Sequence, residues 1–337
     1  MRRPWLLLRG CMALLLLAAL MSSATSSQAE DQWYPGLPEA TFGNWVNAAQ
    51  GGMSYAKRAQ QWFVSPMGMT TAEVYIEQNP DNYNHKWVRA AGYFISPKGA
   101  PANYGYLEPM KVRSVGFGLM PVEATIRISQ RFADGYPVPV RVKLAMINEF
   151  RQRPPGDPTP GMIQDRAFLE STISDRFNVE IIDVKVDGVD LQLDGNCRTV
   201  KPAPVTLVSP AFRIEDVTRY PTYQDDWFRA HDPSTYYHPQ YGGELKGTMT
   251  IPPFTGCTTA AGDDLSDLLT LSASGPDNTV LARTGWPCPY VKNGANAPAP
   301  PGVSNPGLGS GHAPSKELDP RYCPGVKAFD YPDRTAD

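Results

Sequence analysis

The chain has 337 residues, 31 of them basic and 34 acidic, and a formal net charge of −3. This balance argues against a nucleic-acid partner, which needs a basic stripe, and it gives no attraction to anionic lipid. With 34 prolines and 29 glycines, the composition favours strands and turns over long helices. We therefore expect one main β-rich domain followed by a loose tail.

Residues 1–29 have the features of a cleavable secretory signal peptide. Arg2 and Arg3 give a positive start, and residues 11–21 form an apolar run without charge. This run has 11 residues, short of the roughly 20 that a transmembrane helix needs. Residues 27–29, Ser-Gln-Ala, form the small-x-small pattern that a signal peptidase cuts.

Lipid attachment at Cys11 is a weaker interpretation, because most of the apolar run follows this residue and Arg9 lies just before it. Cleavage after Ala29 removes three arginines and no acid, so the formal charge moves from −3 to −6. We expect a protein that is secreted or extracellular, free or associated with the cell wall, with no membrane span and no cofactor.

Residues 30–110 form an aromatic-rich segment that we expect to pack on the core as a cap. Within it, residues 44–62 are compatible with a short helix. Gly51 and Gly52 weaken that helix by about 1 kcal/mol each relative to alanine.

Two β-hairpins are the clearest secondary-structure signals. Residues 122–129 and 138–145 alternate between apolar and polar side chains on either side of an Asp134-Gly135 turn, which predicts an antiparallel pair. Residues 179–186 are rich in β-branched side chains and residues 189–193 alternate between apolar and polar, which predicts a second hairpin around Asp187-Gly188.

The stretch between these hairpins, residues 151–161, is rich in proline and glycine and is expected to be an exposed loop. Further strands are predicted at 205–208 and 244–251, a helical turn at 263–269, and paired strands at 269–274 and 279–283. Short strands separated by turns favour a mainly β fold with few short helices. We expect an antiparallel two-sheet sandwich, with a partly closed β-barrel as the alternative.

Residues 219–243 interleave aromatic rings with aspartates and histidines. Flat rings beside carboxylates suit a sugar or cell-wall ligand, whereas the plainer interpretation is a long loop anchored on the core by its own aromatics. The candidate ligand-binding residues are Tyr223, Asp226, Trp227, Tyr236, Tyr237 and Tyr241.

No catalytic or metal-binding residue is predicted. His231 and His238 share no helical face and have no third ligand at a characteristic spacing. The acidic pairs at 225–226 and 263–264 raise the possibility of glycoside hydrolysis, but adjacent carboxylates rarely reach the required separation, and the second pair is typical of a helix N-terminus. The usual hydrolase and phosphate-binding motifs are absent from the sequence.

Four cysteines remain after cleavage, namely Cys197, Cys257, Cys288 and Cys323. An even number in an exported chain predicts two disulfides, with three possible pairings, of which we prefer Cys257 with Cys288. Zinc is the rival interpretation, but the sequence has no Cys-x-x-Cys. Residues 291–337 are rich in proline and glycine and are predicted to form a C-terminal tail, pinned back at Cys323.

Three stretches carry a resemblance to a known group. They are GFGLMPVEAT at 116–125, DGVD with LDGNCRT at 187–199, and GTMTIPPFTGC at 247–257 running on to Cys288. Over about residues 112–288 the chain resembles uncharacterised secreted β-rich proteins of actinobacteria. The resemblance implies export, a β fold and the last disulfide, but no activity.

The sequence thus divides into a signal peptide at 1–29, an aromatic segment at 30–110, a β-sandwich domain at 111–290 and a tail at 291–337. We expect a non-catalytic cell-envelope or extracellular protein that binds a glycan or a protein partner through the aromatic loop. A secreted hydrolase that acts on cell-wall polymer is the alternative.

Overall fold

The computed structural model describes residues 36–37, 45–116, 120–219, 236–239, 242–287, 291–292, 295–296 and 329–330. The predicted signal peptide lies outside these residues, as does most of the predicted tail. Within the described part of the chain, no helix has the length and apolar character needed to cross a membrane.

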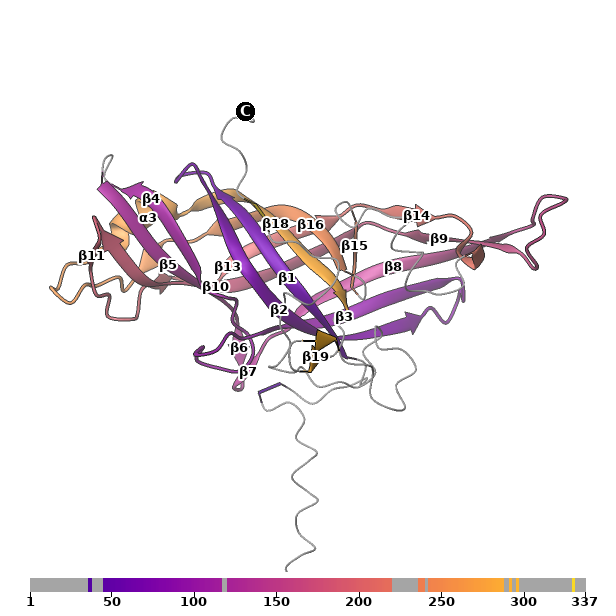
Figure 1. Cartoon of the computed structure of the whole chain (residues 1–337), viewed down its shortest axis with the longest axis horizontal. Coiled ribbons are helices and arrows are strands. Elements are labelled where there is room, and N and C mark those ends of the chain that lie inside the picture. Colours follow the sequence, from indigo (N-terminus) through magenta and orange to yellow (C-terminus); the bar gives the residue numbers. More distant parts are fainter. Residues whose placement is uncertain are drawn as a thin grey trace, which may run out of the picture. The chain divides into compact units, whose positions relative to one another are not determined.

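One antiparallel sheet of 16 strands dominates the fold. Figure 1 shows β4, β5, β11 and α3 at one end of this sheet and β9 and β14 at the other. Its strands are β1 (Trp45–Ala56), β2 (Gln61–Gln78), β3 (His85–Ile95), β4 (Met110–Gly116), β5 (Met120–Gln130), β8 (Val140–Arg151), β9 (Ile163–Phe168), β10 (Ser171–Val186), β11 (Val189–Asp190), β12 (Arg198–Thr199), β13 (Ala203–Ser209), β14 (Phe212–Ile214), β15 (Tyr237–His238), β16 (Gly242–Ile251), β17 (Phe254–Thr255) and β18 (Gly275–Pro287).

The sheet curls until its distant members meet. Its order runs β14-β9-β8-β3-β2-β1-β18-β16-β13-β10-β12-β17. The start of β10 nevertheless lies beside β8. The Ser171 hydroxyl donates to the Lys143 carbonyl (3.1 Å), and the amide of Leu169, just before β10, donates to the Ala145 carbonyl (3.0 Å). The predicted mainly β, antiparallel fold is confirmed, and one curled sheet corresponds to the partly closed barrel among the two expected architectures.

Alternating burial shows which face of β13 points inward. On β13, Val205 and Leu207 are buried whereas Thr206 between them is exposed, as expected for a strand with one face on the core. The larger cluster of buried side chains fills one part of the curl and comprises Val46, Val74, Val88, Ala90, Val142, Leu144, Met146, Phe168, Ile173, Val205, Leu207, Ile214, Tyr237 and Leu245.

A second core cluster lies beneath the end of the sheet that includes β4, β5 and β10. It contains the two half-cystines together with Val112, Val179 and Phe254. The short helix α3 (Ser266–Ala273) lies against this cluster through partly buried Leu269 and Ala273. The helical turn predicted at 263–269 is therefore present, whereas the strand predicted at 269–274 is wrong.

The first predicted hairpin is right in its turn and wrong in its partners. Asp134 and Gly135 adopt positive φ angles (52° and 83°) and close a small pair, β6 (Phe132–Ala133) with β7 (Tyr136–Pro137). Beyond this turn the long strands diverge, since β5 pairs with β4 and β10 while β8 pairs with β3 and β9. Buried Gln130 lies where they part and donates to the carbonyls of Gly92 (3.0 Å) and Val138 (2.9 Å).

The second predicted hairpin is confirmed. Lys185 pairs with Asp190 and Val186 with Val189, so β10 and β11 meet across the Asp187-Gly188 turn. The strands predicted at 205–208 and 244–251 are also present as β13 and β16. Residues 152–162 connect β8 to β9 without helix or strand, as the proline and glycine content predicts.

The predicted helix at 44–62 is wrong. This stretch forms β1 and the start of β2, which lie in the middle of the sheet order rather than over one end of the core. The reason is a period of two, because Val46, Ala48 and Gln50 all face the interior. Gly52 follows at a register shift between β1 and β2, where the poor helix propensity of glycine is no disadvantage.

The structure pairs Cys197 with Cys257 (S–S 2.01 Å), so the preferred pairing of Cys257 with Cys288 is wrong. The cause is the pairing of β12 with β17, which sets Arg198 opposite Thr255 and brings the two flanking cysteines together. Both are almost fully buried in the second core cluster. Cys288 and Cys323 lie outside the described residues.

Replacing both bonded cysteines, Cys197→Ala with Cys257→Ala, should lower the free energy of unfolding by about 4 kcal/mol. The bond closes a loop with a sequence separation of 60, and constraining a loop of that length in the unfolded chain gives this magnitude. Denaturant titration measures the change. Mass spectrometry of non-reduced peptides provides the check, because a peptide linking Cys257 to Cys288 would contradict the structure.

Candidate functional site

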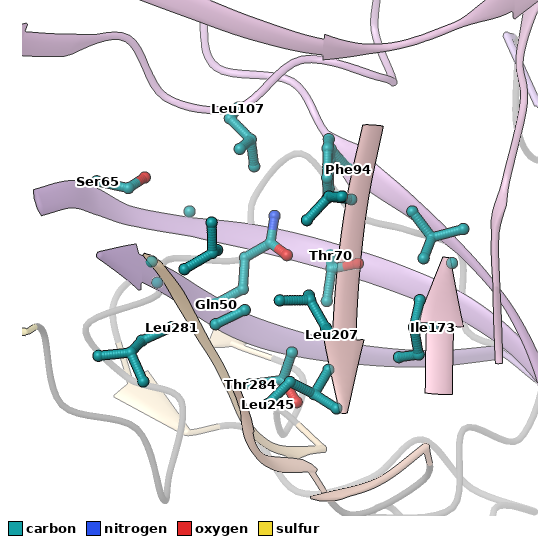
Figure 2. A pocket seen from close by; sticks show the side chains of 18 of the residues that line it. Gln50, Ser65, Thr70, Phe94, Leu107, Ile173, Leu207, Leu245, Leu281 and Thr284 are labelled. Carbon is teal, nitrogen blue, oxygen red and sulfur yellow. The ribbon is translucent and has the colours of Figure 1, made fainter. Parts of the chain in front are cut away.

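The curled sheet forms a partly open cavity of about 230 Å³. Its wall is formed by β1, β2, β3, β8, β10, β13, β16 and β18, with contributions from β4, β5 and the segment before β4. Figure 2 shows aliphatic side chains around most of the space. The labelled lining residues are Gln50, Ser65, Thr70, Phe94, Leu107, Ile173, Leu207, Leu245, Leu281 and Thr284.

The space exists because inward-facing residues become smaller along β2. They run from buried Val74 through Ala72 and Thr70 to Gly68, with the first in the packed core and the others on the cavity wall. A Cβ added at Gly68 would meet no atom within 4 Å. The inward face of β2 is therefore packed against the core near Val74 and borders open space near Gly68.

The layer of Ala72 contains a second small residue, on the neighbouring strand β3. Ala72 pairs with Val46 on β1 and with Gly92 on β3, and Gly92 pairs in turn with Val140 on β8. Ala72 and Gly92, two of the smallest residues, therefore lie next to each other on β2 and β3. Eight strands leave an interior that side chains can just fill, so a layer of small residues leaves room for a ligand.

Aromatic rings bound the cavity on one side. The rings of Phe94 and Phe177 stack with their centroids 5.6 Å apart, which ties β3 to β10 across the interior. Leu107 and Ile128 line the same space. The backbone amide of Leu107 donates to the carbonyl of Ile128 (2.9 Å), so the segment before β4 is held against β5.

The polar side chains on the wall are those of Gln50, Ser54, Ser65, Thr70, Tyr237 and Thr284. The Thr70 hydroxyl donates to the Tyr93 carbonyl (3.0 Å) and the Ser65 hydroxyl to the Pro66 carbonyl (3.1 Å), so both are satisfied within the protein. Gln50 differs, because its Nε2 atom is buried and has no hydrogen-bond partner in the part of the chain that the structure describes. No described residue on the wall carries a charge.

The predicted aromatic platform is only partly described. Tyr223, Asp226, Trp227 and Tyr241 lie outside the described residues. Tyr237 is 8% exposed and lines the cavity, and its burial raises the pKa of its hydroxyl.

The ring of Tyr236, the remaining candidate, lies 4.8 Å from that of Phe212, centroid to centroid. Both described tyrosines thus contact the body of the protein, as expected for a loop anchored by its own aromatics. His231 lies outside the described residues.

His238 is buried against the edge of Phe168, with centroids 5.2 Å apart. Burial, assisted by the positive charge of Arg166, lowers the pKa of His238 to about 3. The side chain is therefore neutral at physiological pH. No three His, Cys, Asp or Glu side chains among the described residues are arranged to hold a metal ion.

The acidic pair at 263–264 behaves as a helix terminus. The Asp264 carboxylate accepts a hydrogen bond from the amide of Ser266 (2.9 Å), the first residue of α3. Hydrogen bonding from the side chain of Ser266 and from its backbone amide lowers the pKa of Asp264. The pair at 225–226 lies outside the described residues.

A network of ion pairs lies away from the cavity, at the β9 end of the sheet. Buried Asp165 accepts hydrogen bonds from Arg151 (2.9 Å), from Arg213 (2.9 Å) and from the backbone amide of Asp216 (2.8 Å). Arg153 in turn bridges Asp216 and Asp157. The network joins the loop after β8 to the 3₁₀ turn η1 (Val217–Arg219), so it fixes the base of the aromatic loop.

Three carboxyl groups of this network, those of Asp157, Asp165 and Asp216, have lowered pKa values, and for Asp216 the main cause is the hydrogen bond from Arg153. Burial alone would raise the pKa of Asp165, but the hydrogen bonds from Arg151, Asp216 and Arg213 outweigh it and hold the pKa at about 2. The pKa of Asp157 is also lowered to about 2, first by its hydrogen bonds from Thr159 and then by Arg153.

Gln50, Gly68 and Gly92 were not singled out by the sequence reasoning. The available signal was small residues at every second position, Gly68, Thr70 and Ala72 in one stretch and Ala90 and Gly92 in another, but neither stretch was predicted to be a strand. Comparisons of the chain with protein-family models, curated proteins and solved structures find no match. The cavity and its wall are accordingly the features from which a function can be inferred.

The ion-pair network should make the protein sensitive to acid. Because the folded-state pKa of Asp165 is below its ordinary value of 3.8, its contribution to stability is present above about pH 4 and is lost as the pH falls towards 2. Asp165→Asn should therefore lower the free energy of unfolding at pH 6 by about 2 kcal/mol. This is less than the 3–5 kcal/mol of a fully buried pair, since Arg151 and Arg213 are about half exposed.

Denaturant titrations at pH 6 and at pH 2.5 test this expectation. The unchanged protein should lose more stability between the two pH values than the Asp165→Asn variant does. Asp81→Asn, in an exposed loop, is the control and should follow the unchanged protein. Equal losses in Asp165→Asn and the unchanged protein would show that this carboxyl makes no pH-dependent contribution.

Proposed function

We propose that the protein is an exported, non-catalytic binding protein that holds an apolar small molecule inside its curled sheet. The observation that carries the proposal is the cavity of about 230 Å³ with a mainly aliphatic wall. Transfer of apolar surface from water into such a space is favourable, and binding sites for small molecules are typically concave and mostly apolar.

The size of the cavity supports a compact ligand or a single hydrocarbon chain. It exceeds the roughly 150 Å³ of an engineered cavity that stays dry and binds benzene in another protein. It is below the range of drug-sized sites, which begins at about 300 Å³. An aliphatic chain of about ten carbons is the class of ligand that we propose.

A binding role is supported over hydrolysis by the character of the wall. Glycoside hydrolysis needs two facing carboxyl groups, and no described residue on the cavity wall has one. The proposed export is supported by the Cys197–Cys257 disulfide, because such bonds persist mainly in oxidising compartments. A location outside the cytoplasm stays part of the proposal.

The cavity is favoured over the aromatic loop as the binding site. Of the two described tyrosines of the loop, Tyr237 is directed into the apolar interior, and Tyr236 lies against Phe212. Neither forms an open platform for a glycan. Binding of a glycan through Tyr223, Trp227 or Tyr241 stays a prediction.

Gly68→Leu should block ligand binding without loss of stability. The new side chain enters open space at a backbone position without positive φ, so it fills the cavity and leaves the strand unstrained. We expect the affinity for an apolar fluorescent dye, N-phenyl-1-naphthylamine, to fall at least about 10-fold. Filling the cavity should leave the melting temperature unchanged or raise it.

Thr206→Leu is the matched control, because it adds the same side chain to the exposed face of β13. This variant should bind the dye as the unchanged protein does. If Gly68→Leu bound the dye with the full affinity of the unchanged protein, the dye would have to bind elsewhere, and the proposed site would be wrong.

A further inference from the structure

We infer that Gln50 is the polar anchor of the cavity, and that the ligand is an uncharged aliphatic compound with a hydrogen-bond acceptor such as a ketone or ester carbonyl. The inference rests on the proposed function and specifies its ligand class. Figure 2 shows the Gln50 amide projecting among the apolar side chains of the wall. Its donor Nε2 is the group for which the described residues offer no acceptor.

The backbone holds Gln50 in place from both sides. It pairs with Gly68 on β2 and with Thr284 on β18, and the register shifts next to it on both strands. Each shift adds one residue to the neighbouring strand, and such bulges re-aim side chains and occur beside functional sites. Because Gly68 has no side chain, the space opposite Gln50 is left open.

An unpaired amide donor in an apolar interior is costly, and buried polar groups are almost always hydrogen-bonded. An apolar residue at this position would pack without leaving an unpaired donor. A ligand that accepts a hydrogen bond from Nε2 would remove the cost of burying that donor. The terminal torsion of glutamine has a broad energy profile, so a small rotation turns Nε2 towards the ligand.

The rest of the wall determines the charge of the ligand. No described lining residue is charged, so an ionised carboxylate or ammonium would lose its hydration without a counter-ion. The hydroxyls of Thr70 and Ser65 already donate to backbone carbonyls. A neutral acceptor at Gln50, with the remaining ligand surface apolar, is the chemistry that fits this wall.

Three ligands with the same chain length test the inference, namely decane, 2-decanone and decanoate. Competition with the fluorescent dye gives their affinities for the unchanged protein. We expect 2-decanone to bind about 10-fold more tightly than decane, since it satisfies one buried donor. Decanoate should bind at least about 10-fold more weakly than 2-decanone at neutral pH.

Gln50→Met tests the residue, because methionine has a similar length and no donor. In this variant the preference for 2-decanone over decane should disappear, while the melting temperature of the free protein is unchanged or raised. Thr70→Val is the matched control, since it removes a wall hydroxyl that is already satisfied, and the preference should persist.

The outcomes separate the two proposals. Equal affinities for decane and 2-decanone in the unchanged protein, or a preference that survives Gln50→Met, would overturn the role of Gln50 and leave the apolar cavity as the binding site. Tighter binding of decanoate would overturn the inferred neutral ligand. If none of the three compounds binds, both the proposed function and this inference are wrong.

Discussion

The return of β10 to β8 is the contact on which the interior depends. The Ser171 hydroxyl at the start of β10 donates to the Lys143 carbonyl of β8, and the Leu169 amide just before β10 donates to the Ala145 carbonyl. Because the sheet curls back in this way, residues from strands far apart in the sequence face one another across the interior. Their sizes then decide whether that space is filled, as around Phe168, or left hollow, as around Gly68.

Local features of the fold were predictable from the sequence, and long-range pairings were not. Alternating apolar residues and the Asp187-Gly188 turn identify strands and a hairpin because their physical causes lie within a few residues. The partners of β5 and β8 depend on Gln130, whose bonds reach Gly92. The pairing of Cys197 with Cys257 likewise follows from β12 meeting β17, which no local pattern specifies.

The candidate site was harder to predict than the fold. Sequence reasoning favoured large aromatics, whereas the cavity depends on the absence of side-chain volume at Gly68, Ala72 and Gly92. Small residues at alternating positions do not distinguish a hollow interior from close contact between neighbouring strands. Gly247 illustrates the second case, since a Cβ there would lie 1.8 Å from the Thr206 carbonyl oxygen. Only the register of the curled sheet separates the two situations.

The hollow interior has an energetic consequence that bears on function. At about 24 cal/mol per Å³ of closed, empty cavity, a volume of about 230 Å³ would cost at most on the order of 5 kcal/mol relative to a filled core. This is comparable with the roughly 4 kcal/mol that the disulfide contributes and with the whole stability of a marginal domain. An occupant that fills the space and accepts the Gln50 hydrogen bond would recover much of this cost, because a ligand that binds only the folded state stabilises it. The same small residues on β2 and β3 would therefore lower the stability of the empty protein and provide the space that the proposed ligand fills.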